Sequence, residues 1–395
     1  MPHPAPRPRI AVFGAGSIGC HLGGRLAPFA DVTLIGRPAA MEALRKHGLV
    51  VSGGGRPVTR VDPAAVRLST SAEAATDADH VLVTVKSAAT REAARQLAPH
   101  LAPGAVVVSF QNGLRNPEVL RAGLRDRDGA EADAGTRGPG TGTVTGPGRP
   151  AAGAAEPAAG EAAADRRRAP RVLAGMVPYN VVQTAPGRFH QGTAGVLMID
   201  DDPAGAPLTA LLARAGLRVE ARPDMREIQH AKLLMNLNNA INALSGLPLR
   251  DQLGRRPYRF CLALCQREAL AAYRAAEVRP ARLGALPALW MPRLLRLPDP
   301  VFRRLAAATL AIDAEARSSM WEDLRRGRPT EIDSLQGEIV SLAEQHGLRA
   351  PVNARLVTLV RQAEAAGPEA ARTWSGPELL AELSAARVPT GPVPD

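Results

Sequence analysis

Residues 10–19 read IAVFGAGSIG, an apolar run of strand length that leads directly into a glycine-rich turn. Gly14, Gly16 and Gly19 have the G-x-G-x-x-G spacing, in which the first glycine permits a tight turn and the second lets a pyrophosphate approach the backbone. The third lets helix and strand pack closely, and the phosphates lie at the helix N-terminus. Because the motif follows a strand and opens a helix, it predicts a dinucleotide site. The expected cofactor-binding residues of this loop are Gly14, Ala15, Gly16, Ser17, Ile18 and Gly19.

Strand-like and helix-like segments alternate around this loop. The apolar runs of strand length are Ile10–Phe13, Asp31–Ile35, Val81–Val85 and Ala105–Phe110, followed later by Arg171–Val182, Gly195–Ile199 and Leu217–Ala221. Helical patterns separate the early runs, at Ser17–Leu26, Ala39–His47 and Thr90–Leu97. Near-continuous Val, Ile and Leu strands that alternate with helices are typical of a parallel sheet covered on both faces. The sequence therefore predicts an α/β fold with an N-terminal, Rossmann-type, doubly wound parallel sheet.

The character of the chain changes twice after this alternating part. Residues 126–168 are nearly all Gly, Pro, Ala, Thr and charged residues, too poor in bulky apolar side chains to offset their ordering entropy, so we expect a disordered insertion. After Pro223 the pattern is helical, with candidate helices at Met225–Leu244, Arg259–Ala276, Val301–Arg325, Glu331–His346 and Asn353–Ala365. We expect a cofactor domain over residues 1–222 and an all-α substrate and catalytic domain over residues 223–395.

Composition excludes several classes of protein. The net charge is +11, but acidic residues are interleaved with the basic ones and aromatic residues make up only 3%, too few to stack bases, so we expect no nucleic-acid partner. No apolar run is long enough to span a membrane, and no secretory signal opens the chain. Three Cys without a C-x-x-C pair indicate reduced thiols and a cytoplasmic location, and the eight His form no metal-binding pattern.

The end of the second strand indicates which dinucleotide is bound. An NAD site has an Asp or Glu about 20 residues after the glycine motif, where it holds the ribose 2′-hydroxyl. Here residues 34–38 read LIGRP, with no acid, and Arg37 could meet a 2′-phosphate instead. The sequence therefore favours NADP(H), against the alternative that Arg37 is one more Arg in an Arg-rich chain.

Lysine is rare, because only three of the 49 Lys and Arg residues are Lys. A lysine can give up a proton, whereas arginine stays charged in proteins. Lys86 and Asn112 each follow an apolar strand, where ligands of a doubly wound sheet bind. Lys232, Asn236 and Asn239 have the spacing of one helical face, which indicates either a ligand site or a hydrogen-bond network between helices.

Glu331 lies in the segment PTEID, which opens a predicted helix. Thr330 could cap this helix with Glu331 in its first turn, and capping alone would explain both residues.

Together these segments resemble the ketopantoate reductase (2-dehydropantoate 2-reductase) family. The resemblance covers nearly the whole chain except the N-terminal tail and residues 126–168, and its motifs in order are GAGSIG, VTVK, QNG, KLLMN, SSMWEDLRRGRPTEID and HGLRAPVN. The family joins a Rossmann domain to a helical domain like that of 6-phosphogluconate dehydrogenases, with the active site between them. The resemblance implies reduction of ketopantoate to pantoate with NADPH, a step toward pantothenate.

The resemblance also implies roles for single residues. Lys232 matches the catalytic lysine, which would donate a proton to the ketone oxygen, and Asn236 matches the first substrate asparagine. Lys86 and Asn112 match residues near the nicotinamide and the substrate. Ser319 matches the serine that binds the substrate carboxylate. Finally, Glu331 matches a carboxylate that contacts substrate or cofactor.

The sequence departs from the family in its asparagines. The family's second asparagine, eight residues after the lysine, is replaced by Ala240, and a further one is missing near Leu249. Asn239 and Asn242 are the candidates to replace them. Two alternatives therefore stay open: an NADP-dependent reductase of another 2-keto acid or an imine, and an NADP(H)-binding sensor without turnover. The expected partners are a small 2-keto acid and, at most, a second copy in a homodimer.

Overall fold

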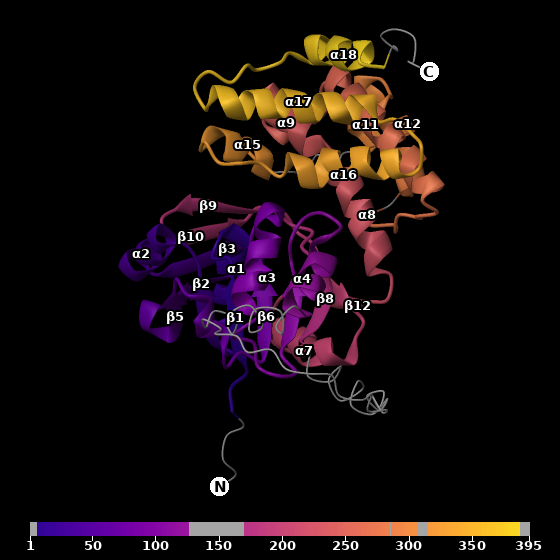
Figure 1. Cartoon of the computed structure of the whole chain (residues 1–395). Helices are drawn as coiled ribbons and strands as arrows, with labels where there is room; N and C mark the ends of the chain where they lie inside the picture. The colour runs from indigo at the N-terminus through magenta and orange to yellow at the C-terminus, as the bar shows by residue number, and fades with distance from the viewer. Residues whose placement is uncertain (1–5, 126–169, 285, 306–314, 388–395) are drawn as a thin grey trace, which may run out of the picture.

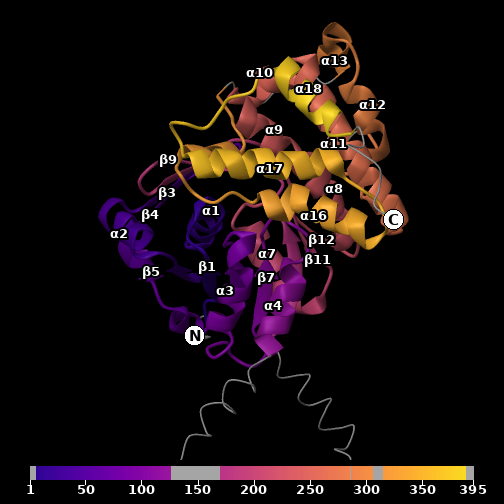
Figure 2. The same ribbon diagram turned by 45° about the horizontal axis from the view of Figure 1, so that its top comes forward.

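The computed structural model describes residues 6–125, 170–284, 286–305 and 315–387 (Figure 1). The insertion predicted to be disordered, residues 126–168, lies outside the described residues. Within them, the strands form two sheets and the helices after residue 223 gather at one end of the molecule (Figures 1 and 2).

The main sheet has eight strands in the order β12-β11-β8-β7-β6-β1-β2-β5. Its strands are β1 (Arg9–Phe13), β2 (Asp31–Ile35), β5 (Val66–Ser69), β6 (His80–Val83), β7 (Val106–Ser109), β8 (Arg171–Met176), β11 (Leu197–Asp200) and β12 (Val219–Arg222). All neighbours pair parallel except β8 and β11. The prediction of an N-terminal doubly wound parallel sheet is confirmed, with this one antiparallel pair as an addition.

Alternate residues of β1 enter the cores on opposite faces of this sheet. Val12 packs in the core that includes α1 (Ser17–Leu26), α2 (Pro38–His47) and α7 (Ala206–Arg214). Phe13 packs in the core on the other face, with α3 (Thr90–Leu97) and α4 (Asn116–Arg125). Because successive side chains of a strand point to opposite faces, a continuous apolar strand such as β1 is buried only when helices cover both sides.

A second, four-stranded sheet was not predicted. Its order is β4-β3-β10-β9, and its strands are β3 (Leu49–Gly53), β4 (Arg56–Val61), β9 (Val181–Ala185) and β10 (Arg188–Gln191). It packs on α1, where a Cβ at Gly24 would stand 2.5 Å from Val51 Cγ2. The single strand expected over Arg171–Val182 is wrong, because β8 ends at Met176 and the chain crosses through Pro178 into β9 of the other sheet.

The helices after β12 share a core of their own, separate from those of the main sheet. They are α8 (Met225–Asn236), α9 (Asn238–Ser245), α10 (Leu249–Leu253), α11 (Arg256–Ala275), α12 (Met291–Leu295), α13 (Asp299–Leu305), α15 (Ser319–Arg325), α16 (Ile332–Gln345), α17 (Pro351–Ala366) and α18 (Gly376–Ala385). The α/β class with a helical C-terminal part is thus confirmed. All three Cys are buried free thiols, and Cys261 and Cys265 lie in the helical core.

Two predicted helices are interrupted. The helix expected over Met225–Leu244 breaks at Leu237, where the buried Gln336 side chain donates to the Leu237 carbonyl at 2.8 Å. The helix expected over Val301–Arg325 is wrong as one element, since residues 316–318 are not helical. Ser318 caps the N-terminus of α15 instead, with its hydroxyl accepting from the Trp321 N–H.

Arg259 joins the short helices to α11. Its side chain is fully buried and donates to the carbonyls of Leu253, Leu295 and Leu297 at 2.7–3.1 Å. Its guanidinium also pairs with Asp299 at 2.8 Å and lies 4.1 Å from the centre of the Phe302 ring. A buried charge is tolerated only when it is paired and hydrogen-bonded, and here the carbonyls at the ends of α10 and α12 supply those partners.

Candidate functional site

The glycine-rich turn between β1 and α1 has the backbone of a phosphate-binding loop. Gly14 has φ 118°, in the region that favours glycine, and a Cβ there would stand 2.6 Å from Val85 N. A Cβ at Gly19 would overlap Gly14 O. At Gly16, by contrast, a Cβ would meet no protein atom within 4 Å. Gly14 and Gly19 are therefore needed by the fold, whereas the space over Gly16 would let a ligand approach the backbone.

The N-terminus of α1 leaves its first N–H groups available to such a ligand. Gly16 is the N-cap, makes no side-chain cap bond, and no acidic residue occupies the first turn. The first N–H groups of a helix have no intrahelical acceptor and carry the positive end of the helix dipole. This loop therefore fits the pyrophosphate of a dinucleotide.

Arg37 lies at the end of β2 beside the same loop. The strand ends reach the loop directly, because Gly14 N donates to Ile35 O at 2.9 Å and a Cβ at Gly36 would stand 2.8 Å from the Ala15 Cβ. Arg37 follows in extended conformation as the N-cap of α2, and its side chain is exposed. A guanidinium in this place is available to a phosphate group on the ribose next to the loop.

Lys86, which follows β6, reaches across to the helical part of the chain. Its ammonium donates to Pro329 O at 2.6 Å and pairs with Asp323 Oδ1 on α15 at 2.8 Å. The Asp323 side chain is only 11% exposed. Burial raises the pKa of this carboxyl, although the Lys86 ammonium opposes the shift. The pair therefore links the end of a sheet strand to α15, and sequence reasoning gave Asp323 no role.

Glu331 also faces the strand ends. Its Oε2 accepts from the Asn112 amide at 2.9 Å, and its Oε1 accepts from the N–H and the hydroxyl of Ser87, both at 3.3 Å. The Thr330 hydroxyl accepts from the Ile332 N–H at 3.3 Å at the start of α16, as capping predicts, but Glu331 is the N-cap residue rather than part of the first turn and makes no side-chain cap bond. The carboxylate is used instead to contact the loops after β6 and β7.

A buried network holds those two loops. The Asn116 amide donates to Asn112 O and to the Ser87 hydroxyl at 3.0 Å, while its Oδ1 accepts from the Thr90 hydroxyl at 2.6 Å. Gln111 continues the network, donating to Thr90 Oγ1 at 2.7 Å. Neither Ser87 nor Asn116 was predicted, and Asn116 in particular resembles an ordinary residue at the start of a helix. Together they fix the backbone from which Asn112 reaches Glu331.

Helix α8 completes the contact between the two halves. The buried Asn236 donates to Asn112 Oδ1 at 3.3 Å, so Asn112 touches both Asn236 and Glu331. Lys232 lies one helical turn before Asn236 and is half-buried. Burial lowers the pKa of the Lys232 ammonium to about 8. Among the described residues it has no hydrogen-bond or ion-pair partner, so nothing offsets that loss of hydration.

The remaining asparagines of this helix pair have different surroundings. The break at Leu237 places Asn239 on α9, where it is half-buried and its carbonyl accepts from the Ser318 hydroxyl at 3.2 Å. Asn242 is fully buried. Its side-chain oxygen accepts from Ser318 N at 2.9 Å, and its side-chain nitrogen donates to Leu247 O at 3.0 Å. Asn242 is thus committed to the fold, and Ala240 is also fully buried.

Ser319 opens α15 with an exposed side chain, directly after the Ser318 that contacts α9. The structure therefore joins Asn112, Asn236 and Glu331 in one set of contacts between sheet and helices. Lys86 precedes Ser87, a partner of Glu331, Lys232 lies one turn before Asn236, and Ser319 follows the Ser318 that contacts α9. The glycine loop and Arg37 lie at the ends of neighbouring strands of the same sheet.

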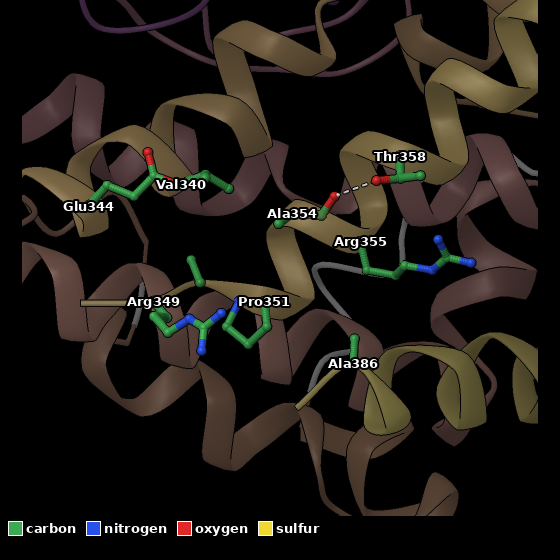
Figure 3. Close-up of a pocket in the computed structure, with 9 residues that line it drawn as sticks. Val340, Glu344, Arg349, Pro351, Ala354, Arg355, Thr358 and Ala386 are labelled. Carbon is green, nitrogen blue, oxygen red and sulfur yellow. Dashed lines mark hydrogen bonds between the residues drawn. The ribbon is translucent and has the colours of Figure 1, made fainter. Parts of the chain in front are cut away.

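A pocket of about 340 Å³ lies elsewhere, between α16, α17 and the end of α18 (Figure 3). It is lined by residues such as Arg349 and Arg355 and shares none with the contacts at the strand ends. No described helix has the length and hydropathy to cross a membrane. The described residues also contain no group of three or more His, Cys, Asp or Glu arranged to hold a metal ion.

Comparison with known proteins gives matches over most of the chain. The family model described as ketopantoate reductase PanE/ApbA matches residues 10–203, and that of its C-terminal part matches residues 224–364. A 2-dehydropantoate 2-reductase of Mesorhizobium japonicum is 30% identical over 364 residues, which cover 90% of this chain and 97% of that protein.

Solved structures with the same fold include two enzymes. A PanE/ApbA family ketopantoate reductase from Ralstonia eutropha has a TM-score of 0.67 at 29% identity, covering 90% of this chain and 98% of that one. A D-mandelate dehydrogenase solved with NADH and anilino(oxo)acetate has a TM-score of 0.65 at 16% identity, with the same coverage of both chains. The second likeness is one of fold.

Proposed function

Because this chain belongs to the ketopantoate reductase family, we propose that it reduces 2-dehydropantoate to pantoate with NADPH. It is an oxidoreductase of the class that acts on CH–OH groups, and its fold is that of enzymes using a nicotinamide cofactor. The choice of NADPH, the substrate and the residue roles are our proposal. The contact of Asn112 with both Asn236 and Glu331, one turn from Lys232, is the observation that carries it.

The cofactor part of the proposal rests on the loop and on Arg37. The exposed N-terminus of α1 and the open approach to Gly16 would hold the pyrophosphate, and the exposed Arg37 would bind the 2′-phosphate. When bound, NADPH supplies a hydride to the substrate's ketone carbon. Lys86 and Asn112, at the ends of two neighbouring strands, would face the nicotinamide end.

In the proposed reaction, Lys232 donates the proton. As the C2 carbonyl gains a hydride, negative charge develops on its oxygen, and the Lys232 ammonium stabilises that charge and protonates it to a hydroxyl. The neutral amine then recovers a proton from water. A pKa of about 8 makes Lys232 a stronger acid than an ordinary lysine while most of it stays charged at neutral pH. Asn236 would orient the substrate, and Ser319 would hydrogen-bond its carboxylate.

Glu331 and Asp323 act on this site through their partners. Glu331 accepts from Asn112 and from Ser87, so it fixes the loops after β6 and β7 against the helical part. Asp323 does the same for Lys86. Both carboxylates therefore assemble the site across the two halves in addition to any contact that Glu331 makes with a ligand.

The test is consumption of NADPH by the full chain with 2-dehydropantoate, compared with NADH and with the Lys232→Arg variant. We expect turnover with NADPH, a lower rate with NADH, and at least a hundredfold loss in the variant. Lys46→Arg is the matched control, since Lys46 is exposed in the last turn of α2. Near-normal turnover by Lys232→Arg would remove the proton-donor role, and no turnover by the wild type with any keto acid would remove the proposal.

A second candidate is reduction of a different 2-keto acid or an imine. It is favoured by Ala240, which is fully buried where the family has its second asparagine. Rates of NADPH consumption with a panel of keto acids, all measured at the same NADPH concentration, separate this candidate from the first. Tight NADPH binding without turnover on any of them would favour the sensor alternative instead. We also propose a domain boundary between residues 222 and 223, a cytoplasmic location, a homodimer and a place in pantothenate synthesis.

A further inference from the structure

Met235 is an exposed hydrophobic residue on the helix that carries Lys232. Its side chain is 55% exposed, and it is the only large hydrophobic residue of α8 and α9 with such exposure. Its neighbours Leu233, Leu234 and Leu237 are all buried in the helical core. Single exposed hydrophobic residues are common on surfaces, so the position of Met235 decides its meaning.

That position is on the same face as the proposed proton donor. Met235 is three residues after Lys232 and four before Asn239, which are the spacings of side chains that lie next to each other on a helix. Leu237, at the break between α8 and α9, keeps right-handed helical angles (φ −57°, ψ −21°), so this face continues across the break. Lys232, Met235 and Asn239 therefore form one row, with Asn236 beside it.

Asn239 has a side chain that no other part of the described chain uses. Its amide makes no hydrogen bond within the described ranges, whereas its carbonyl is bound by the Ser318 hydroxyl at 3.2 Å. That bond places Asn239 next to the start of α15, where Ser319 is exposed. The row on α8 and α9 thus ends beside the residue proposed to bind the substrate carboxylate.

We infer that Met235 and Asn239 recognise the side chain of the keto acid, an inference that rests on the proposed function. Lys232 accounts for the ketone oxygen and Ser319 for the carboxylate. The two groups left in the row are a flexible apolar thioether and an unpaired amide. They fit a substituent that is branched and apolar at C3 and carries a hydroxyl beyond it, with Met235 contacting the alkyl part and Asn239 the hydroxyl.

The experiment compares three acids that differ in these features. They are 2-dehydropantoate, 3-methyl-2-oxobutanoate, which keeps the branch and lacks the hydroxymethyl group, and pyruvate, which lacks both. Met235→Ala should lower kcat/KM for the two branched acids by about tenfold and leave that for pyruvate within about twofold, because a lost methylene-sized contact is worth that much. Met235→Leu should restore the branched acids to near the wild-type value.

Asn239→Ala should act on the hydroxyl alone. It should lower the ratio of kcat/KM for 2-dehydropantoate over 3-methyl-2-oxobutanoate by about tenfold or more. Leu348→Ala is the matched surface control, because Leu348 is an exposed hydrophobic residue far along the chain, between α16 and α17. It should change none of the three values.

The inference is overturned if the wild type reduces these acids and neither Met235→Ala nor Asn239→Ala changes the ratios of kcat/KM among the three acids by more than twofold. Failure of the proposed function is a different result, in which the wild type consumes NADPH with none of the acids. In that case calorimetric titration of each acid into the protein with NADP⁺ decides the inference. Selective binding of branched acids that Met235→Ala abolishes would support it, and absence of binding would end it.

Discussion

Raising the pH should slow reduction by this protein, because the proposed proton donor is a half-buried lysine whose pKa burial lowers. Burial lowers the pKa of Lys232 from its ordinary 10.5 to about 8, and no described acid is paired with it. Only the charged form can donate a proton, so kcat/KM should fall tenfold for each pH unit above that pKa.

The size of the effect separates this lysine from an ordinary one. At about pH 10 a group of pKa 8 keeps its proton in about one molecule in a hundred, whereas a lysine of pKa 10.5 keeps it in about three in four. We therefore expect kcat/KM to fall about a hundredfold between pH 7 and pH 10, against less than twofold for an unperturbed lysine. The assay is the initial rate of NADPH consumption with 2-dehydropantoate across that range.

The contribution of Lys232 to stability should change in the opposite direction over the same range. Because the folded-state pKa of Lys232 is lowered, the unfolded chain binds more protons between about pH 8 and 10.5, so this group makes unfolding less favourable as the pH rises. Below pH 8 both states are protonated, and the cost of burying the charge is fully present. The buried thiols of Cys20 and Cys261 act the other way, because their pKa values are raised from 9.0 to about 12 and only the unfolded chain loses these protons near pH 9. Loss of activity while the chain stays folded, followed by circular dichroism, would therefore identify titration of the site and exclude unfolding.

In the folded chain, the shifted cysteines and His21 do not titrate in this window. The pKa values of Cys20 and Cys261 are raised by burial to about 12, and that of His21 is lowered by burial to about 3. Lys232→Arg should lose the alkaline decrease together with most of the rate, while Lys46→Arg keeps both. A wild-type profile that is flat to pH 10, or an alkaline decrease that survives in Lys232→Arg, would refute the assignment of Lys232.

Three further changes test other parts of the molecule. Arg37→Ala should lower kcat/KM with NADPH by about 10- to 100-fold and leave that with NADH unchanged, because only NADPH has a ribose 2′-phosphate for the guanidinium. Asp323→Asn should raise KM for NADPH more than it lowers kcat, since it releases Lys86. A double-mutant cycle of Asp323→Asn with Lys86→Met should give a coupling energy of at least about 1 kcal/mol in urea unfolding, and additivity would show that the pair is not formed. Arg259→Met should lower the free energy of unfolding by about 3–5 kcal/mol, because it leaves three carbonyls and a carboxylate without their donor. Arg274→Met, at an exposed position of the same helix, should change it by less than about 0.5 kcal/mol, and equal losses would contradict this account.

The main sheet could be predicted because its signal is local. Its central strands β1, β6 and β7 are apolar runs that bury both faces, so the pattern needs no knowledge of the neighbours. The edge strand β5, which reads VRLS, has no such run and was not predicted. The second sheet has no such signal. Its β3 and β10 pair residues 49–53 with residues 188–191, and β4 is largely exposed. Strands of this kind are stabilised by partners distant in the sequence, and a single sequence does not reveal such pairing.

The break in the α8–α9 helix was missed for a related reason. Residues 225–244 have good helical spacing throughout, and nothing local ends the helix at Leu237. The cause lies in two buried glutamines of other helices, Gln266 and Gln336, which donate to the carbonyls of Leu234 and Leu237 at 3.1 and 2.8 Å. Glutamine on a helix usually predicts an exposed position, so its insertion beside another helix is visible only in the fold.

The candidate site likewise contains residues that could be predicted from the sequence and one that could not. Lys86, Asn112, Asn236 and Glu331 could be named from strand ends, helical spacing and family motifs. The contacts join the last three directly, while Lys86 contacts Pro329 and Asp323 instead. Asp323 could not be named, because an acid followed by Arg325 and Arg326 in a short helix resembles a solvated charge. Its importance depends on what faces it, and Lys86 reaches it from a segment more than 200 residues away.

The scarcity of lysine acquires a physical meaning from these surroundings. Lys86 contacts Asp323 and the Pro329 carbonyl, so its role is to hold two parts of the chain together. Lys232 has no such partner, and burial shifts its pKa toward neutrality. An arginine at position 86 would supply the same charge, although its larger, forked side chain would alter the geometry. An arginine at position 232 could not donate the proton, whatever its geometry. In the proposed mechanism, lysine is required at position 232 for proton donation and at position 86 for geometry, so only substitution at 232 should abolish the pH dependence together with the rate.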